Sequence, residues 1–220
     1  MIIAISQSTQ LNNELQDCLN QSYIAFLASL GCVPLLIPNT IPDASEYAEA
    51  FGAKALVLTG GRDCAPDVDG DTSGLPSCRD RIERQLLTWA TERRLPVIGI
   101  CRGFHFLNVF FGGQIAFSTV SAGHVGTVHG VQLTDPAVAA FFGCERPEVN
   151  SFHNNAVYSR GLAIPFRAFA TAEEDIVEGA KHCSLPVYGI QWHPERPGPN
   201  PRANADMLKS FLGLARGVKL

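Results

Sequence analysis

The stretch Pro96-Val97-Ile98-Gly99-Ile100-Cys101-Arg102-Gly103 decides the fold. An apolar run leads into a cysteine that stands between two glycines, and a helical pattern of apolar residues follows Gly103. A strand that turns sharply into a helix presents the residue at the turn, and only small neighbours avoid a clash there. The spacing Gly-x-Cys-x-Gly therefore predicts a nucleophile at Cys101. A buried cysteine beside packing glycines is the alternative.

A cysteine nucleophile needs a base, and His193 is the best placed of the six histidines. It follows another apolar run, Val187–Gln191, and Glu195 lies two residues further on. A carboxylate at that distance would accept the imidazole N–H and fix its tautomer. Cys101 would also begin a helix, where the positive end of the dipole favours a thiolate. We predict that Cys101, His193 and Glu195 act together.

Two glycines close a third apolar run, Ala55–Thr59. Glycines at the end of a strand can expose backbone N–H groups, and acyl transfer needs such donors aimed at the developing oxyanion. The candidates are the N–H groups of Gly61 and Arg102. A plain turn is the alternative interpretation of Gly60-Gly61.

Around these motifs, the first half of the chain alternates between strand-like and helix-like segments. The strand candidates have no polar alternation, which is typical of a parallel sheet covered on both faces; they are Ile2–Ser6, Val33–Ile37, Ala55–Thr59 and Pro96–Ile100. Apolar residues at helical spacing from Leu15 to Leu30, ended by Gly31, predict the first helix. The sequence therefore predicts an α/β fold, an open and mostly parallel sheet with helices on both faces.

The second half contains shorter extended segments separated by turn residues, so we expect small antiparallel additions to the sheet. Near the end, Asn200 is expected to cap a last helix, with Pro201 at its first position. No linker divides the chain, which predicts a single domain over residues 1–220.

The composition excludes several classes of protein. The 220 residues carry 17 Lys and Arg against 21 Asp and Glu, and 46% of them are hydrophobic. This is a globular composition with a net charge of −4, without the basic footprint of a nucleic-acid-binding protein. No apolar run approaches the ~20 residues that span a bilayer. The seven scattered cysteines do not form a disulfide framework, and Met1–Gln7 lacks the features of a signal peptide, so we expect a cytoplasmic protein.

Several further motifs occur in the same order; they are Gly60-Gly61-Arg62-Asp63, Arg79-Asp80 with Glu83, Leu107-Asn108-Val109 with Gly112-Gly113, Val149-Asn150-Ser151-Phe152-His153-Asn154, and Gln191-Trp192-His193-Pro194-Glu195. With the cysteine turn, this set resembles the class I glutamine amidotransferase superfamily. Within it, the chain is most similar to the free-standing γ-glutamyl hydrolases, including the γ-glutamyl-γ-aminobutyrate hydrolases. The resemblance implies a flavodoxin-like fold, a Cys101–His193–Glu195 triad, a γ-glutamyl thioester and release of glutamate, without a cofactor.

The resemblance also implies a set of substrate contacts, at Gly60, Arg62, His105, Ser151, Phe152 and His153. His105 stands where the family usually has a glutamine. Arg62 and Arg102 would suit an anionic leaving group, although an ion pair with Asp or Glu is equally compatible with the sequence. The segments Asn150–Asn154 and His193–Arg196 are similar to those of a narrower group that hydrolyses γ-glutamyl-CDP-amidate in capsule synthesis.

Other functions remain open at this point. His124, His129 and His153 are not a recognised set of metal ligands, so we expect no metal. The protein is either a stand-alone hydrolase of a small γ-glutamyl compound, a glutaminase subunit that supplies ammonia to a synthase, or a non-catalytic binding protein on the same fold. Release of free glutamate separates the last from the first two. No nucleic-acid or membrane partner is expected, and a homodimer stays open.

Overall fold

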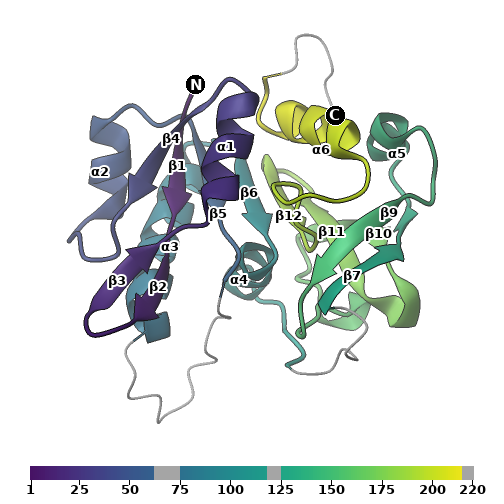
Figure 1. Ribbon diagram of the computed structural model, residues 1–220, viewed down its shortest axis with the longest axis horizontal. Coiled ribbons are helices and arrows are strands. Elements are labelled where there is room, and N and C mark those ends of the chain that lie inside the picture. The colour runs from purple at the N-terminus through teal and green to yellow at the C-terminus, as the bar shows by residue number, and fades with distance from the viewer. Residues whose placement is uncertain (62–74, 118–124, 215–220) are drawn as a thin grey trace.

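The computed structural model describes residues 1–61, 75–117 and 125–214. Within these ranges, an eight-stranded sheet forms the centre of the molecule (Figure 1), in the order β4-β1-β5-β6-β12-β11-β10-β8. The first five strands in this order are parallel; they are β4 (Val33–Ile37), β1 (Ile2–Ser6), β5 (Ala55–Leu58), β6 (Val97–Ile100) and β12 (Val187–Ile190). The last three pair antiparallel; they are β11 (Val177–His182), β10 (Phe166–Thr171) and β8 (Gln132–Leu133).

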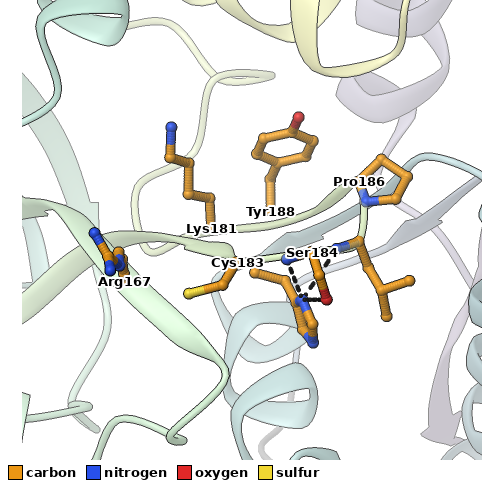
Figure 2. A pocket seen from close by; sticks show the side chains of 8 residues that line it. Arg167, Lys181, Cys183, Ser184, Pro186 and Tyr188 are labelled. Atoms are coloured by element: carbon orange, nitrogen blue, oxygen red, sulfur yellow. Dashed lines mark hydrogen bonds between the residues drawn. The ribbon is translucent and has the colours of Figure 1, made fainter.

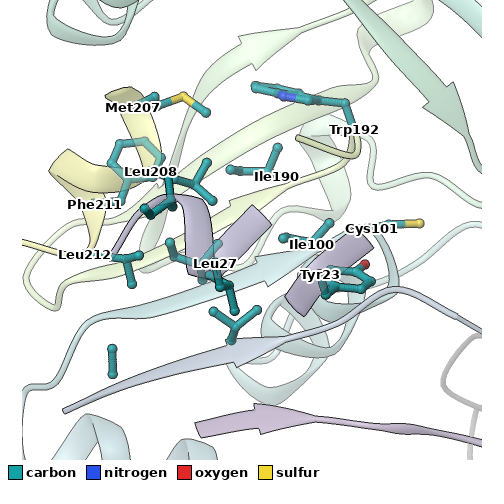
Figure 3. Packing of buried hydrophobic residues seen from close by; sticks show 14 of the residues in the cluster. Tyr23, Leu27, Ile100, Cys101, Ile190, Trp192, Met207, Leu208, Phe211 and Leu212 are labelled. Carbon is teal, nitrogen blue, oxygen red and sulfur yellow. The ribbon is translucent and has the colours of Figure 1, made fainter. Parts of the chain in front are cut away.

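Helices cover both faces of the sheet. One face packs against α1 (Gln21–Ser29), α5 (Pro136–Phe142) and α6 (Pro201–Phe211), and the other against α2 (Ala44–Ala50), α3 (Leu75–Glu92) and α4 (Arg102–Phe110). Figure 3 shows Leu27 of α1 and Leu208 of α6 packed with Ile100 and Ile190 of the sheet. Successive strand residues point to opposite faces, so a continuous apolar run fills both layers. The predicted α/β fold is confirmed.

The segment before α1 differs from the prediction. Residues 8–18 form a hairpin of β2 (Ser8–Leu11) and β3 (Leu15–Cys18), so the helix expected from Leu15 to Leu30 begins only at Gln21, and its predicted start was wrong. The carboxylate of Asp17 accepts hydrogen bonds from the backbone N and the side-chain Nδ2 of Asn39, at 2.9 and 2.7 Å. These bonds tie the segment to the loop after β4, while Leu15 stays exposed. The apolar residue was therefore never part of a buried helical stripe.

Two helices in the second half of the chain also depart from the prediction. Helix α5 was missed, although the sequence carries its signals: the Asp135 side chain accepts from Ala137 N at 2.9 Å, Pro136 is the first residue, and Gly143 ends the helix at a φ of 69°. Asn200 does precede α6, but its φ is 55° and its Nδ2 donates to Glu148 O. Its side chain thus holds a neighbouring strand and does not cap the helix.

The strands β7 (Val125–Gly130) and β9 (Glu148–Phe152), with β8 and α5 between them in the sequence, pair antiparallel as a separate two-stranded sheet (Figure 1), and Asn150 of β9 bonds to His193 after the end of β12. Short 3₁₀ turns cover Ser159–Gly161 and Glu173–Asp175. In the part of the chain that the structure describes, no helix has the length and apolar character needed to cross a membrane.

We expect Gly103→Ala to destabilise the fold strongly. A Cβ at Gly103 would lie 2.1 Å from the carbonyl oxygen of Leu58, which is backbone of β5 and cannot move aside. Overpacking of this kind typically costs ~1–3 kcal/mol and occasionally more, and we expect the upper part of that range. Urea unfolding followed by circular dichroism measures the loss. The matched control is Gly130→Ala, where nothing lies within 4 Å of the added Cβ; equal stability of the two variants would contradict the close approach.

Candidate active site

Cys101 lies in the turn between β6 and α4. Its φ of 53° and ψ of −109° are rare for a residue with a side chain, and its backbone N donates to Ile190 O at 2.7 Å. Such strain persists only where the surrounding structure enforces it, and it is typical of functional turns. The sulfur stands at the N-terminal end of α4, where the helix dipole favours a negative charge. This is the strand-to-helix turn that the spacing of the two glycines predicts.

His193 follows β12 and is held from two sides. Its Nδ1 lies 2.6 Å from Oε1 of Glu195, and both side chains are buried. Asn150 of β9 accepts from the backbone N of His193 at 2.8 Å and donates to its carbonyl O at 2.9 Å. Because the carboxylate accepts the Nδ1 proton, Nε2 is left as the acceptor, which is the tautomer a general base requires.

The topology brings Cys101 and His193 to the same end of the sheet. β6 and β12 are parallel neighbours with Ile100 opposite Ile190, so the residues that follow them meet. Gly60 follows β5, the other neighbour of β6. A Cβ on Gly60 would lie 3.0 Å from His193 Cε1 and 3.6 Å from Cys101 Cβ. Any larger residue at position 60 would therefore fill the space between Cys101 and His193.

The oxyanion candidates lie at two backbone positions beside Cys101. The N–H of Gly60 donates to the hydroxyl of Tyr23 at 2.8 Å. Burial, together with the negative charge of Glu195, raises the pKa of Tyr23 well above its usual value, so this hydroxyl stays neutral. Since the Gly60 N–H is engaged, Gly61 is the candidate donor at this strand end. Arg102 is the first residue of α4, where backbone N–H groups point out of the helix.

His105 lies in the interior, next to Gln191 and on the same helix as Arg102. Its Nε2 is 2.8 Å from Oε1 of Gln191, and the Nε2 of Gln191 lies 3.8 Å from the sulfur of Cys101. The ring is 1% exposed. This differs from the substrate contact expected at position 105. Sequence reasoning missed Gln191, although it stands two residues before His193 in the same motif.

Arg102 also differs from the expectation. Its guanidinium is buried and forms ion pairs with Glu83 and Asp80 of α3, which is the ion-pair alternative that the sequence left open. The expected Arg62 lies outside the described residues. A different arginine, Arg196, lines a small cavity of about 60 Å³ together with Gly60 and Gly61. Its position directly after the His-Pro-Glu motif was the available sequence signal.

Three substrate contacts were expected at the end of β9, at Ser151, Phe152 and His153. Phe152 lies at the site, and the other two are buried. Phe152 borders the site, with its ring 5.6 Å from that of His193 and the guanidinium of Arg196 4.4 Å above it. Ser151 is fully buried. His153 is buried with its Nε2 3.3 Å from the carboxylate of Glu178, which differs from the predicted substrate contact.

The interior position of His153 follows from the buried carboxylate beside it. Burial alone would raise the pKa of Glu178, but His129 and His153, whose Nε2 atoms lie 3.6 and 3.3 Å from its carboxylate, lower it to about 2. An ionised carboxylate in the interior needs such partners. The two histidines thus face a carboxylate on β11, and His124, the third member of the metal set considered above, lies outside the described residues.

A larger cavity, of about 500 Å³, lies far from the candidate site. Figure 2 shows Arg167, Lys181 and Tyr188 among the residues around it. It is lined by Pro186, just before the start of β12, whereas His193 follows the end of that strand. Cys101, His193 and Glu195 are therefore not among the residues that line this larger cavity.

Comparison with known proteins identifies relatives of this chain. The sequence profile of the family described as Peptidase C26 matches residues 2–195. The γ-glutamyl-CDP-amidate hydrolase of Campylobacter jejuni is 31% identical over 177 residues, which cover 79% of this chain and 76% of that protein. A subunit of the glutamine-hydrolysing GMP synthase of Pyrococcus furiosus is 26% identical over 185 residues, covering 84% and 87%. The solved structure of a GMP synthase subunit from Thermoplasma acidophilum has the same fold, with a TM-score of 0.71 at 20% identity over 97% and 93% of the two chains.

Proposed function

The chain belongs to the Peptidase C26 family of class I glutamine amidotransferase-like proteins, and we propose that it acts there as a stand-alone hydrolase of γ-glutamyl amides. The observation that carries the proposal is the meeting of Cys101, in its strained turn, with the buried His193–Glu195 pair around Gly60. A nucleophile, an oriented base and backbone donors at one point are the parts that acyl transfer needs.

The reaction proceeds in two halves. His193 Nε2 takes the proton of the Cys101 thiol, and the sulfur attacks the γ-carbonyl carbon of the substrate. The resulting oxyanion is held by the N–H groups of Gly61 and Arg102. Collapse of the tetrahedral intermediate breaks the C–N bond, and the imidazolium of His193 gives its proton to the departing amine. Water, deprotonated by His193, then attacks the thioester, which releases glutamate and restores the thiol.

The leaving group is proposed to be larger than ammonia and anionic. Arg196 lines the small cavity together with Gly60 and Gly61, and its side chain is 28% exposed. Its guanidinium lies over the ring of Phe152, so a ligand in the cavity could reach it in a defined position. A guanidinium matches carboxylate and phosphate groups. The similarity to a γ-glutamyl-CDP-amidate hydrolase supports a phosphate-bearing leaving group, and the family resemblance supports γ-glutamyl-γ-aminobutyrate.

The test compares the purified protein, without any partner, on glutamine, γ-glutamyl-γ-aminobutyrate and γ-glutamyl-CDP-amidate, with free glutamate as the readout. We expect the highest kcat/KM on one of the two anionic compounds. The second candidate is a glutaminase subunit, which the similarity to the GMP synthase subunit of Pyrococcus furiosus favours. If glutamine gave the highest kcat/KM and a partner protein were needed to reach it, this second function would replace the first. No glutamate from any compound would favour a binding protein.

We expect Arg196→Ala to weaken the preference for an anionic leaving group. A hydrogen bond to a charged group contributes ~1.5–3 kcal/mol, so kcat/KM on the anionic compound should fall by roughly 10–100-fold. Arg196 also lies 3.6 Å from Glu195, and for that reason the ratio of the anionic compound to glutamine is the quantity to measure. Arg202→Ala, at a side chain 96% exposed on α6, is the matched control. Equal losses on both substrates would exclude leaving-group recognition by Arg196.

A further inference from the structure

Arg79 belongs to α3, on the face of the sheet that α2 and α4 also cover, and its side chain reaches the end of β5 where Gly60 and Gly61 follow. Its buried guanidinium donates through Nη1 to Gly60 O at 3.1 Å and through Nη2 to Thr59 O at 2.6 Å. A further bond from Nη2 goes to Thr59 Oγ1 at 3.0 Å. One side chain therefore fixes two successive carbonyl groups, and the mechanism above gives it no role.

The bond to Gly60 O determines where the Gly61 N–H points. In a trans peptide the C=O and N–H bonds point in opposite directions, and no cis peptide bond occurs in the described residues. With Gly60 O turned toward Arg79, the N–H of Gly61 is turned away from Arg79. Gly61 lines the same small cavity as Gly60 and Arg196, and this cavity is the space that the N–H would face.

This peptide is unusually free to adopt the wrong orientation. It joins two glycines, and Gly61 has a φ of 131°, a conformation that residues with a Cβ rarely adopt. Without side chains on either residue, little resists a rotation that would exchange the positions of the C=O and the N–H. The hydrogen bonds of Arg79 supply the preference that the local sequence lacks.

The same network reaches the second oxyanion candidate. Glu83 accepts from Arg79 Nε at 2.8 Å and forms an ion pair with the guanidinium of Arg102. Burial alone would raise the pKa of Glu83, but the charges of Arg102 and Arg79 outweigh it and lower the pKa, so the carboxylate stays ionised. Glu83 thus links Arg79, which bonds to the Gly60–Gly61 peptide, with Arg102, whose own N–H is the second candidate donor.

We propose that Arg79 is a positioning residue that holds the Gly60–Gly61 peptide with the Gly61 N–H toward the substrate, so that the oxyanion site is formed before the substrate binds. The inference rests on the proposed function and deepens it. Arg79 does not touch the substrate, and its effect is transmitted through the orientation of one peptide group.

The kinetic test uses Arg79→Lys and Arg79→Gln on the best substrate of the panel. Loss of one oxyanion donor lowers kcat by roughly 10²–10³-fold, and we expect a fall of this size with a KM within a few-fold of wild type. Alkylation of Cys101 by iodoacetamide needs no oxyanion site and should keep its rate within about threefold, because Cys101 and His193 are unchanged. A comparable fall in the alkylation rate would indicate general disruption and overturn the proposal.

Arg81→Gln is the matched control. Arg81 lies on the same helix and also donates to backbone carbonyls, at Pro42, Asn39 and Ile41, but on the side away from Cys101. It should keep kcat within about twofold of wild type. If Arg81→Gln lost as much activity as Arg79→Gln, the effect would belong to the stability of α3 and the proposal would fail.

A structural readout separates this inference from the proposed function. In a crystal structure of Arg79→Gln we expect the Gly60–Gly61 peptide to be rotated or to occupy two orientations, and in that of Arg81→Gln to be unchanged. Arg79→Lys keeps the charge opposite Glu83 and gives the same answer if the Gln variant does not fold. An unchanged peptide in the Arg79 variant overturns the inference. If wild type hydrolysed no γ-glutamyl compound, the proposed function would fail while the peptide orientation still decided the role of Arg79.

Discussion

Replacing Cys101 by alanine is expected to abolish hydrolysis of every γ-glutamyl compound while the fold survives. The thiol is the proposed nucleophile, and water held by the remaining site is a far weaker one, so we expect a loss of at least ~10⁴-fold in kcat. Alanine keeps the small Cβ that the strained turn already accommodates. Circular dichroism checks the fold, and glutamate release checks the activity.

The other cysteines provide the controls for this result. Cys144 and Cys183 are exposed, and serine at either position should leave turnover within about twofold of wild type. Cys32 and Cys101 are both buried, but burial raises the pKa of the Cys32 thiol, whereas Cys101 stands at the N-terminal end of α4; iodoacetamide should therefore label Cys32 far more slowly than Cys101. If Cys101→Ala kept more than a few per cent of activity, the thioester mechanism would be wrong. A comparable loss at Cys64 or Cys78 would move the site to the segment between them.

The second large effect is expected at the base. His193→Ala should lower kcat by roughly 10²–10⁴-fold, because the imidazole takes the thiol proton and later activates water. Glu195→Gln should be milder, since its amide oxygen can still accept the hydrogen bond from Nδ1–H that the carboxylate accepts at 2.6 Å. The order of the two kcat values is the measurement.

A histidine outside the site supplies the matched control for the base. His182→Ala removes an imidazole at the opposite end of β12, beside the larger cavity, and should leave kcat unchanged. A Glu195→Gln variant slower than His193→Ala would contradict the roles given to these two residues. A loss at His182 equal to that at His193 would show that the effect is not specific to the base.

The sequence alone determined the parts of this protein that depend on local patterns. Four apolar runs without polar alternation predicted the parallel strands, because strands buried on both faces need apolar residues at every position. Small residues on both sides of Cys101 predicted the sharp turn, because any Cβ at Gly103 would meet β5. His193 and Glu195 are two residues apart, so the contact between them was readable from spacing.

Tertiary structure decided the contacts that join distant segments. The hairpin of residues 8–18 is tied to the loop after β4 by Asp17 bonding to Asn39, and the guanidinium of Arg102 is paired in the interior with Asp80 and Glu83. The sequence offered Arg102 as a ligand or an ion-pair partner, and only the buried carboxylates of α3 distinguish the two. The spacing of apolar residues predicts which face of a helix Arg102 occupies. It does not predict which charged side chain of another helix lies next to it.

The same limit explains the residues that sequence reasoning missed or misplaced. Gln191 meets Cys101 across 90 positions of sequence, and Arg79 meets Gly60 across 19. Neither pair has a spacing rule, because each contact exists only once parallel strands and the helix between them have packed. The candidates for nucleophile and base follow from short local motifs, whereas the orientation of the groups around them is fixed by hydrogen bonds that form only in the folded core.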